Sequence, residues 1–238
     1  MISVKNESIE TRLADAREEI AGVKKFPDSE FAGIIKELGF RCELCARCCT
    51  KEFNDHVFLL DADLAIIRQI NPNVIAPAPY YEFCDQKGRF YVSGYALKTK
   101  PDGSCIFLDN KRCKIYESRP SICRVYPYML HREADESGKV DWRQISGLNE
   151  HGSYHSELKD SECKAIARET RAYEEAYLRQ MICFFEAVEV HFRKNDLKHV
   201  QKIYDRRMRE FLKGGCELEV FVYCEGRFEK HNLKPEIN

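Results

Sequence analysis

The sequence lacks any long uninterrupted apolar segment. No run approaches the roughly 18 apolar residues that a membrane-spanning helix needs, and residues 1–8 lack the apolar stretch of a secretory signal peptide. We therefore predict a cytoplasmic chain with no membrane span. Disulfides are rare in that reducing compartment, so cysteines are expected there as free thiols or as ligands.

An excess of charge of either sign is also missing. Lys and Arg number 38 against 39 Asp and Glu, which leaves a formal net charge of −1. Because this balance creates no global basic field, the composition offers no reason to expect nucleic-acid binding.

Several motifs that identify enzymes are absent. The chain has no G-x-G-x-x-G segment, no phosphate-binding lysine loop and no G-x-S-x-G elbow. The C-x3-C-x2-C triad of radical S-adenosylmethionine enzymes is missing as well, because Cys45-x3-Cys49 is followed by Glu52 where the third cysteine would stand. His151 and His155 are four positions apart, but the Gly152-Ser153 pair between them disfavours the helix that would bring them together as metal ligands. The histidines are therefore expected at the surface. No enzymatic activity is predicted from these motifs.

Cysteine, by contrast, is abundant. The chain has 12 cysteines in 238 residues, and eight of them fall between Cys42 and Cys123. Clustered cysteines in a reducing compartment indicate metal ligands or redox groups. Four of the twelve, one of them inside that stretch, are expected to be packed as ordinary small apolar residues: Cys84, Cys183, Cys216 and Cys224.

The first cysteine group is Cys42-x2-Cys45-x2-Cys48-Cys49. Two intervening residues let neighbouring thiolates converge on one centre, and the first three positions have the C-x2-C-x2-C spacing of ferredoxin-type loops. Neighbouring side chains in extended chain point in opposite directions. One thiol of the Cys48-Cys49 pair could therefore bind the first centre while the other faces a second.

The second group is Cys105-x7-Cys113-x9-Cys123, and Cys163 stands alone further on. Together the two groups and Cys163 supply eight thiols. Eight are enough for two four-coordinate sites, and they are equally compatible with one site and spare cysteines.

The quartet Cys42 to Cys49, followed by the segment from Cys105 to Pro127, resembles the CxxCxxCC family of zinc- or iron-chelating cysteine-cluster proteins. The resemblance covers roughly residues 40–165 and includes the Leu-Asp-Ala-Asp-Leu stretch that opens a helix near Asp61. It implies metal or iron–sulfur binding. The family commonly has Cys-Pro-Gly at the last ligand position, where this chain has Cys163-Lys-Ala. One branch of the family includes flagellin lysine N-methylases, which are longer proteins.

Both zinc and iron–sulfur clusters accept four thiolates. Structural zinc usually has two C-x2-C pairs. This chain instead has three close thiols, a vicinal fourth and remote partners, a pattern that favours an iron–sulfur cluster. We expect one or two [4Fe–4S] centres, with zinc as the alternative. Basic residues beside the cysteines would offset the negative charge of such a cluster. Arg119 and Arg124 are the expected cofactor-side residues, because their motif is shared by the family.

The hydrophobic patterning predicts an α+β fold. A small cysteine-rich metal-binding core with a short antiparallel sheet is expected, flanked by N-terminal helices and a C-terminal helical pair over about 168–194 and 196–213. Residues 89–98 are expected to form a strand and residues 72–79 a Pro-rich loop. The predicted division is 1–40 for the N-terminal helices, 41–165 for the cysteine-cluster domain, and 166–238 for the helical pair and a terminal strand packed on it.

Three functions remain open from the sequence. The first is an iron–sulfur protein that works in electron transfer or as a redox component for a protein partner. The second is a structural zinc-binding interaction module. The third, by family analogy, is an enzyme similar to a protein lysine N-methyltransferase. For either metal the predicted ligands are the same: Cys42, Cys45, Cys48, Cys49, Cys105, Cys113, Cys123 and Cys163.

Overall fold

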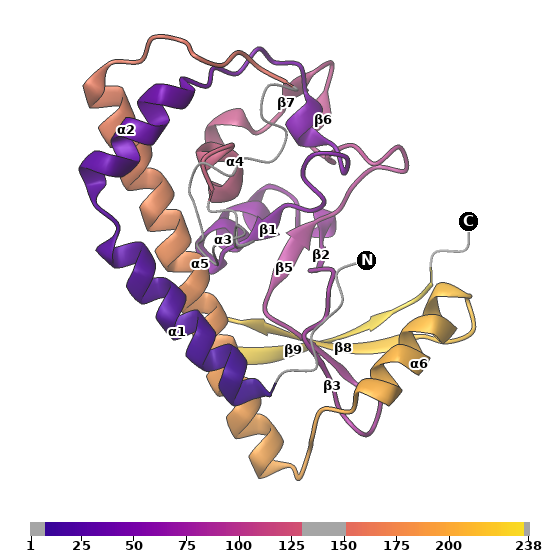
Figure 1. The fold of residues 1–238 in the computed structure, drawn as a ribbon. Coiled ribbons are helices and arrows are strands. Elements are labelled where there is room, and N and C mark those ends of the chain that lie inside the picture. Colours follow the sequence, from indigo (N-terminus) through magenta and orange to yellow (C-terminus); the bar gives the residue numbers. More distant parts are fainter. Residues whose placement is uncertain (1–7, 130–150, 236–238) are drawn as a thin grey trace.

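The computed structural model describes residues 8–129 and 151–235, and it confirms the predicted α+β class (Figure 1). The helices are α1 (Ile9–Lys25), α2 (Asp28–Leu38), α3 (Asp61–Ile70), α4 (Ser121–Val125), α5 (Asp160–Lys194) and α6 (Gln201–Leu212), with 3-10 turns at Arg47–Cys49, Pro72–Val74 and Tyr116–Ser118. The strands are β1 (Phe58–Leu59), β2 (Ile75–Pro77), β3 (Phe83–Cys84), β4 (Phe90–Val92), β5 (Tyr95–Leu97), β6 (Leu108–Asp109), β7 (Arg112–Cys113), β8 (Leu218–Cys224) and β9 (Arg227–Leu233). None of the helices in these ranges is long and apolar enough to cross a lipid bilayer.

Helix α5 is the longest element, and α1 and α2 lie along it (Figure 1). Its buried face repeats at helical spacing, and the apolar members of that face include Leu178, Phe184, Phe185, Val188 and Phe192. The helix begins about eight residues earlier than the predicted position. Its first two turns are mostly polar, so periodicity does not mark them, but Asp160 and Glu162 suit the positive end of the helix dipole.

Helix α2 ends at a glycine that the packing requires. Gly39 has φ +51°, and a Cβ built there would lie 2.3 Å from the Ser156 carbonyl oxygen. The Ser156 amide in turn donates to the Gly39 carbonyl (3.0 Å). This contact places the chain that leaves α2 beside the segment that leads into α5, at the start of the first cysteine group.

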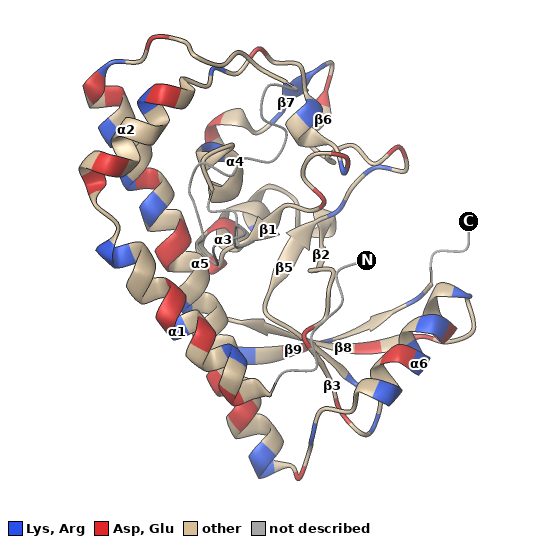
Figure 2. Cartoon of the chain, in the orientation of Figure 1, with Lys and Arg blue, Asp and Glu red and all other residues tan. Residues whose placement is uncertain are grey.

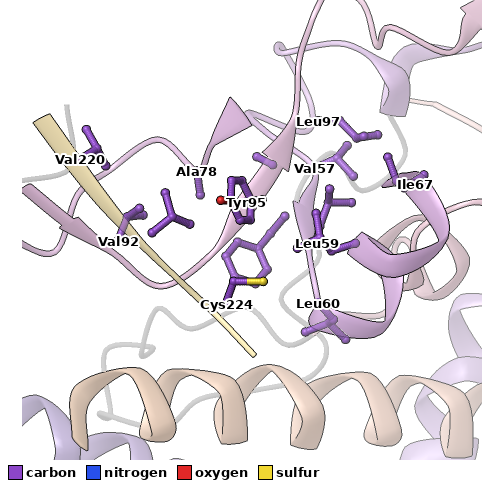
Figure 3. Packing of buried hydrophobic residues seen from close by; sticks show 14 of the residues in the cluster. Val57, Leu59, Leu60, Ile67, Ala78, Val92, Tyr95, Leu97, Val220 and Cys224 are labelled. Carbon is purple, nitrogen blue, oxygen red and sulfur yellow. The ribbon is translucent and has the colours of Figure 1, made fainter. Parts of the chain in front are cut away.

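The largest sheet joins residues 83–92 to the C-terminal strands. Its strand order is β3-β4-β8-β9, and β4 pairs with β8 in parallel while its other pairs are antiparallel. A second sheet has the order β1-β5-β2, and β6 and β7 form a hairpin. The two sheets share one apolar core. Figure 3 shows Tyr95 lying between Leu59 and Leu97 of the second sheet and Val92 and Val220 of the first.

The stretch expected as one strand is split in two. Strands β4 and β5 belong to different sheets and are separated by Ser93-Gly94. A Cβ at Gly94 would lie 2.8 Å from the Phe58 ring and 2.9 Å from the Gln180 side-chain amide, so the chain can turn only because this residue has no side chain. The Pro-rich segment also contains a strand, β2, which pairs with β5.

The C-terminal helices are both present, but they have different neighbours. Helix α5 packs on α1 and α2, whereas α6 packs on β3. The predicted terminal strand is β8, and it pairs with both β4 and β9. The expected boundary at residues 165 and 166 falls within α5. The division into three parts stays a prediction.

Candidate metal centre

The two cysteine groups meet because their backbones pair. The Cys105 amide donates to the Cys49 carbonyl (2.7 Å), and the Lys51 amide donates to the Gly103 carbonyl (3.1 Å). Thr50 and Ser104 form an isolated antiparallel bridge beside these bonds. These backbone hydrogen bonds therefore hold the end of the first cysteine group against the start of the second.

A cavity of about 150 Å³ opens at this junction. Thiols of both groups line it, together with aromatic side chains that include Phe40, Tyr116 and Tyr126. Each group thus contributes soft sulfur donors to one cavity, which is the ligand chemistry that zinc, iron and iron–sulfur clusters prefer. The cysteines at the cavity are Cys42, Cys48, Cys49, Cys105, Cys113 and Cys123.

Four of these thiols affect one another directly. Burial raises the pKa of Cys123, and the neighbouring Cys105, Cys49 and Cys113 raise it further. Burial likewise raises the pKa of Cys105 and of Cys113, with a contribution from Cys49 in both. These thiols therefore keep their protons more readily than an exposed cysteine does, and a metal that binds here has to displace them, because only the thiolate is a ligand.

Cys48 and Cys49 lie with their sulfurs 4.0 Å apart. The hydrogen bond between the two thiols is the main cause of the raised pKa of Cys49, followed by burial. Cys48 belongs to the 3-10 turn Arg47–Cys49, and its carbonyl accepts a hydrogen bond from the Asn54 side-chain amide (3.2 Å).

Cys42 and Cys45 lie on an exposed loop. Leu44 and Ala46, one in each two-residue spacer, have φ of 55° and 65°, a left-handed conformation that wraps the chain tightly around the loop. The Leu44 amide donates to the Cys42 sulfur (3.4 Å). Cys42 lines the cavity, and Cys45 is the one member of the quartet that does not.

Cys163 lies elsewhere. It is 1% exposed on α5, in an apolar cluster with Leu38, Tyr128 and Leu158. The structure does not bring it to the cavity. All twelve cysteines are free thiols, and across residues 8–129 and 151–235 no three Cys, His, Asp or Glu side chains converge closely enough to hold a single metal ion.

Arg119 and Arg124 both line the cavity. The Arg119 guanidinium lies 4.0 Å from the centre of the Tyr116 ring and partly offsets the burial that raises the pKa of Cys113. Arg124 donates to Glu169 on α5 (3.0 Å) and to the Ser121 hydroxyl (2.9 Å). Arg119 is thus the cation nearer to the thiols, whereas Arg124 connects α4 to α5.

Two residues that sequence reasoning missed support this site. Asp63 of α3 accepts hydrogen bonds from the Ser121 amide (3.0 Å) and hydroxyl (2.8 Å) at the start of α4, the helix that carries Cys123. The expectation of surface histidines is wrong for His151, which is 6% exposed. Its Nε2 is hydrogen-bonded to the Tyr126 hydroxyl, and its ring packs against Phe40.

Neither residue had a local signal. In the sequence Asp63 is typical of an acidic residue in the first turn of a helix, and its partner Ser121 lies 58 positions away. His151 has no local pattern either, because its contacts with Phe40 and Tyr126 come from residues distant in the sequence.

Comparisons with known proteins agree with the chemistry of the cavity. Residues 41–146 match the family model CxxCxxCC, described as a "Putative zinc- or iron-chelating domain", which confirms the resemblance predicted from the sequence. An uncharacterized protein of Methanocaldococcus jannaschii, MJ0661, is 34% identical over 104 residues, which are 42% of this chain and 51% of that protein. The chain thus spans about half the length of this relative. No solved structure matches the chain.

Proposed function

We propose that this chain, whose residues 41–146 match a zinc- or iron-chelating family, binds an iron–sulfur cluster in the cavity and serves as a redox component for a protein partner. The proposal includes the reducing, cytoplasmic setting that the free cysteines favour. The observation that carries it is the convergence of thiols from two separate cysteine groups on one cavity.

The size of the cavity favours a cluster over a single zinc ion. One water-sized sphere needs about 10–15 Å³ of such space, so about 150 Å³ has room for a group of several atoms. Thiols placed around this volume suit ligands of a cluster, whereas a single zinc ion needs four donors within about 2.3 Å of one point.

The surroundings suit an anionic group. Arg119 and Lys111 line the cavity, and the hairpin β6–β7 and the turn after it carry the further basic residues Arg112 and Lys114 (Figure 2). Aromatic residues at the wall limit water, which together with nearby cations tunes the reduction potential of a cluster. When bound, the cluster would supply one-electron transfer.

Anaerobic purification and elemental analysis test this proposal. The expected protein is brown, with broad visible absorbance, iron and acid-labile sulfide. A colourless protein that carries stoichiometric zinc and no sulfide would contradict it and favour the structural zinc module, in which chelation unfolds the domain without a redox signal.

A matched pair of variants connects the metal to the cavity. Cys105→Ser removes a cavity thiol, so iron and sulfide should be lost together. Cys183→Ser changes an exposed thiol on α5, so the metal content should stay at the level of the unchanged protein. Equal metal content in both variants would place the cluster elsewhere.

A further inference from the structure

The charged side chains that line the cavity are all cations. They are Lys111, Arg119 and Arg124, and no carboxylate of the described ranges lies among them. Arg124 forms an ion pair with Glu169 (3.0 Å), whereas Lys111 and Arg119 form none with any described residue. The cavity therefore opens at a surface where positive charge is in excess.

Lys111 is held at the cavity by a strained turn. Asn110 and Lys111 form the two-residue loop of the β6–β7 hairpin, with φ of 45° and 62°. Positive φ at both central positions is the pattern of a type I′ turn, in which glycine is the favoured second residue. A lysine there costs free energy that a glycine would not. The chain carries this cost and gains a cation that lines the cavity, which indicates a use for the charge.

Arg112 adds a second exposed cation directly after the turn. Its neighbour Lys114 pairs with Asp109 (3.2 Å), but Arg112 has no ion pair with any residue that the structure describes. The hairpin thus presents two cations, Lys111 and Arg112, whose charge no described carboxylate neutralises.

Two large apolar side chains are exposed beside these cations. Leu44 is 45% exposed and Tyr116 is 46% exposed, and both line the cavity. Exposed apolar residues with a polar, charged rim are typical of protein interfaces. Electron-transfer complexes have small interfaces, so a few such residues around the cavity suit one.

We infer that this surface, formed by Leu44, Lys111, Arg112 and Tyr116, docks an electron-transfer protein that presents an acidic patch around its own redox group. The two cations would pair with carboxylates of the partner and steer its approach. One electron would then pass between the cluster and the partner's redox group, with no bond made or broken. This inference rests on the proposed function, because it takes the partner as one that exchanges electrons with the cavity.

Calorimetric titration of the anaerobically prepared full chain tests the surface, with an acidic plant-type [2Fe–2S] ferredoxin as the probe. Binding is expected at low ionic strength and should be lost at high ionic strength. Lys111→Gly/Arg112→Ser should weaken it about tenfold, because two exposed ion pairs are lost. The matched control is Lys202→Ser/Arg206→Ser, which removes two exposed cations from α6, far from the hairpin (Figure 2). It should bind as the unchanged protein does.

Lys111→Gly alone separates recognition from a structural role. Glycine fits the positive φ, so the urea midpoint of this variant should be equal or higher while its affinity for the ferredoxin falls. A lower midpoint with unchanged affinity would show that Lys111 serves packing, and it would contradict the inference.

The remaining outcomes are also decisive. The inference is wrong if the unchanged protein does not bind the ferredoxin, if the hairpin and control variants lose equal affinity, or if a short single-stranded DNA binds this surface more tightly. The proposed function stands in each of these cases as long as acid-labile sulfide is present. If the unchanged protein contains no sulfide, the proposed function itself fails.

Discussion

A single buried carboxylate positions one of the candidate ligands. Asp63 is 4% exposed, and its two oxygens accept hydrogen bonds from Ser121 at the start of α4 and from the Leu60 amide (3.4 Å) before α3. Helix α4 has only five residues and no side-chain cap of its own. Its placement, and with it that of Cys123, therefore depends on Asp63.

Replacing Asp63 by alanine should cost about 2–3 kcal/mol in the free energy of unfolding, because one buried and two half-buried donors lose their acceptor. Asp63→Asn should cost less, since its carbonyl oxygen can still accept from Ser121. Urea denaturation of both variants measures the difference. Equal costs would mean that the hydrogen bonds to Ser121 contribute nothing to stability.

A second buried carboxyl should make stability depend on pH. Glu82 is 8% exposed, its Oε1 accepts from the Ser93 hydroxyl (2.7 Å), and within the described ranges its Oε2 has no hydrogen-bond partner. Burial raises the pKa of Glu82 to about 7 from an ordinary value near 4.5. Between these two values the folded chain keeps a proton that the unfolded chain releases.

The unfolding free energy should therefore fall as pH rises from about 4.5 to about 7, by up to about 3 kcal/mol from this group. Below that window both states are protonated and the effect vanishes. In Glu82→Gln, which has nothing to ionise, the fall should be smaller by that amount. Urea midpoints at about pH 5 and about pH 8 compare the two proteins, and parallel pH profiles would refute the assignment to Glu82.

At the scale of helices, one arginine of α5 fixes the turn between α1 and α2. The Arg171 guanidinium donates to the carbonyl oxygens of Val23 (2.6 Å) and Phe26 (2.5 Å) and pairs with Asp28 (2.7 Å). The two carbonyls lie at the C-terminal end of α1, where backbone acceptors lack helical partners. The side chain is only 16% exposed, so water replaces these bonds poorly.

Arg171→Ala should lower the unfolding free energy by about 1–3 kcal/mol, and hydrogen exchange should show the lost protection at the end of α1 and the start of α2. Arg179→Ala is the matched control on the same helix. Its ion pair with Glu175 is at the surface, with the arginine 62% exposed, and should contribute less than about 0.5 kcal/mol. Similar losses in the two variants would show that the turn is not held by Arg171.

How well elements could be predicted depended on where their partners lie. The apolar face of α5 from Tyr173 to Phe192 is a local pattern, so that helix was predicted from its spacing. The division of residues 89–98 into β4 and β5 was not, because it depends on Phe58 and Gln180 at Gly94. Strand β2 was missed for a similar reason, since its pairing with β5 overrides the tendency of its prolines to form a loop.

At the scale of the whole molecule, the sequence predicted which kind of residue forms the site better than it predicted which residues come together there. The cysteine groups were enough to predict metal ligands, although their spacing left one centre or two open, and the structure brings both groups to one cavity. Spacing could not place Cys163, whose helix carries it into another apolar cluster. Nor could it find Asp63 or His151, because their roles depend on residues brought close only by folding.

The most direct test of the account is the metal content of Cys49→Ser, Cys123→Ser and the double variant, prepared anaerobically beside Cys183→Ser. Cys49 comes from the first cysteine group and Cys123 from the second, so both should be ligands of the one cluster proposed in the cavity. The account predicts that each single substitution removes the same iron and sulfide, and that the double variant loses no more. If either single variant keeps its full iron and sulfide, or if the two losses add, the two groups do not share a centre and the account is wrong.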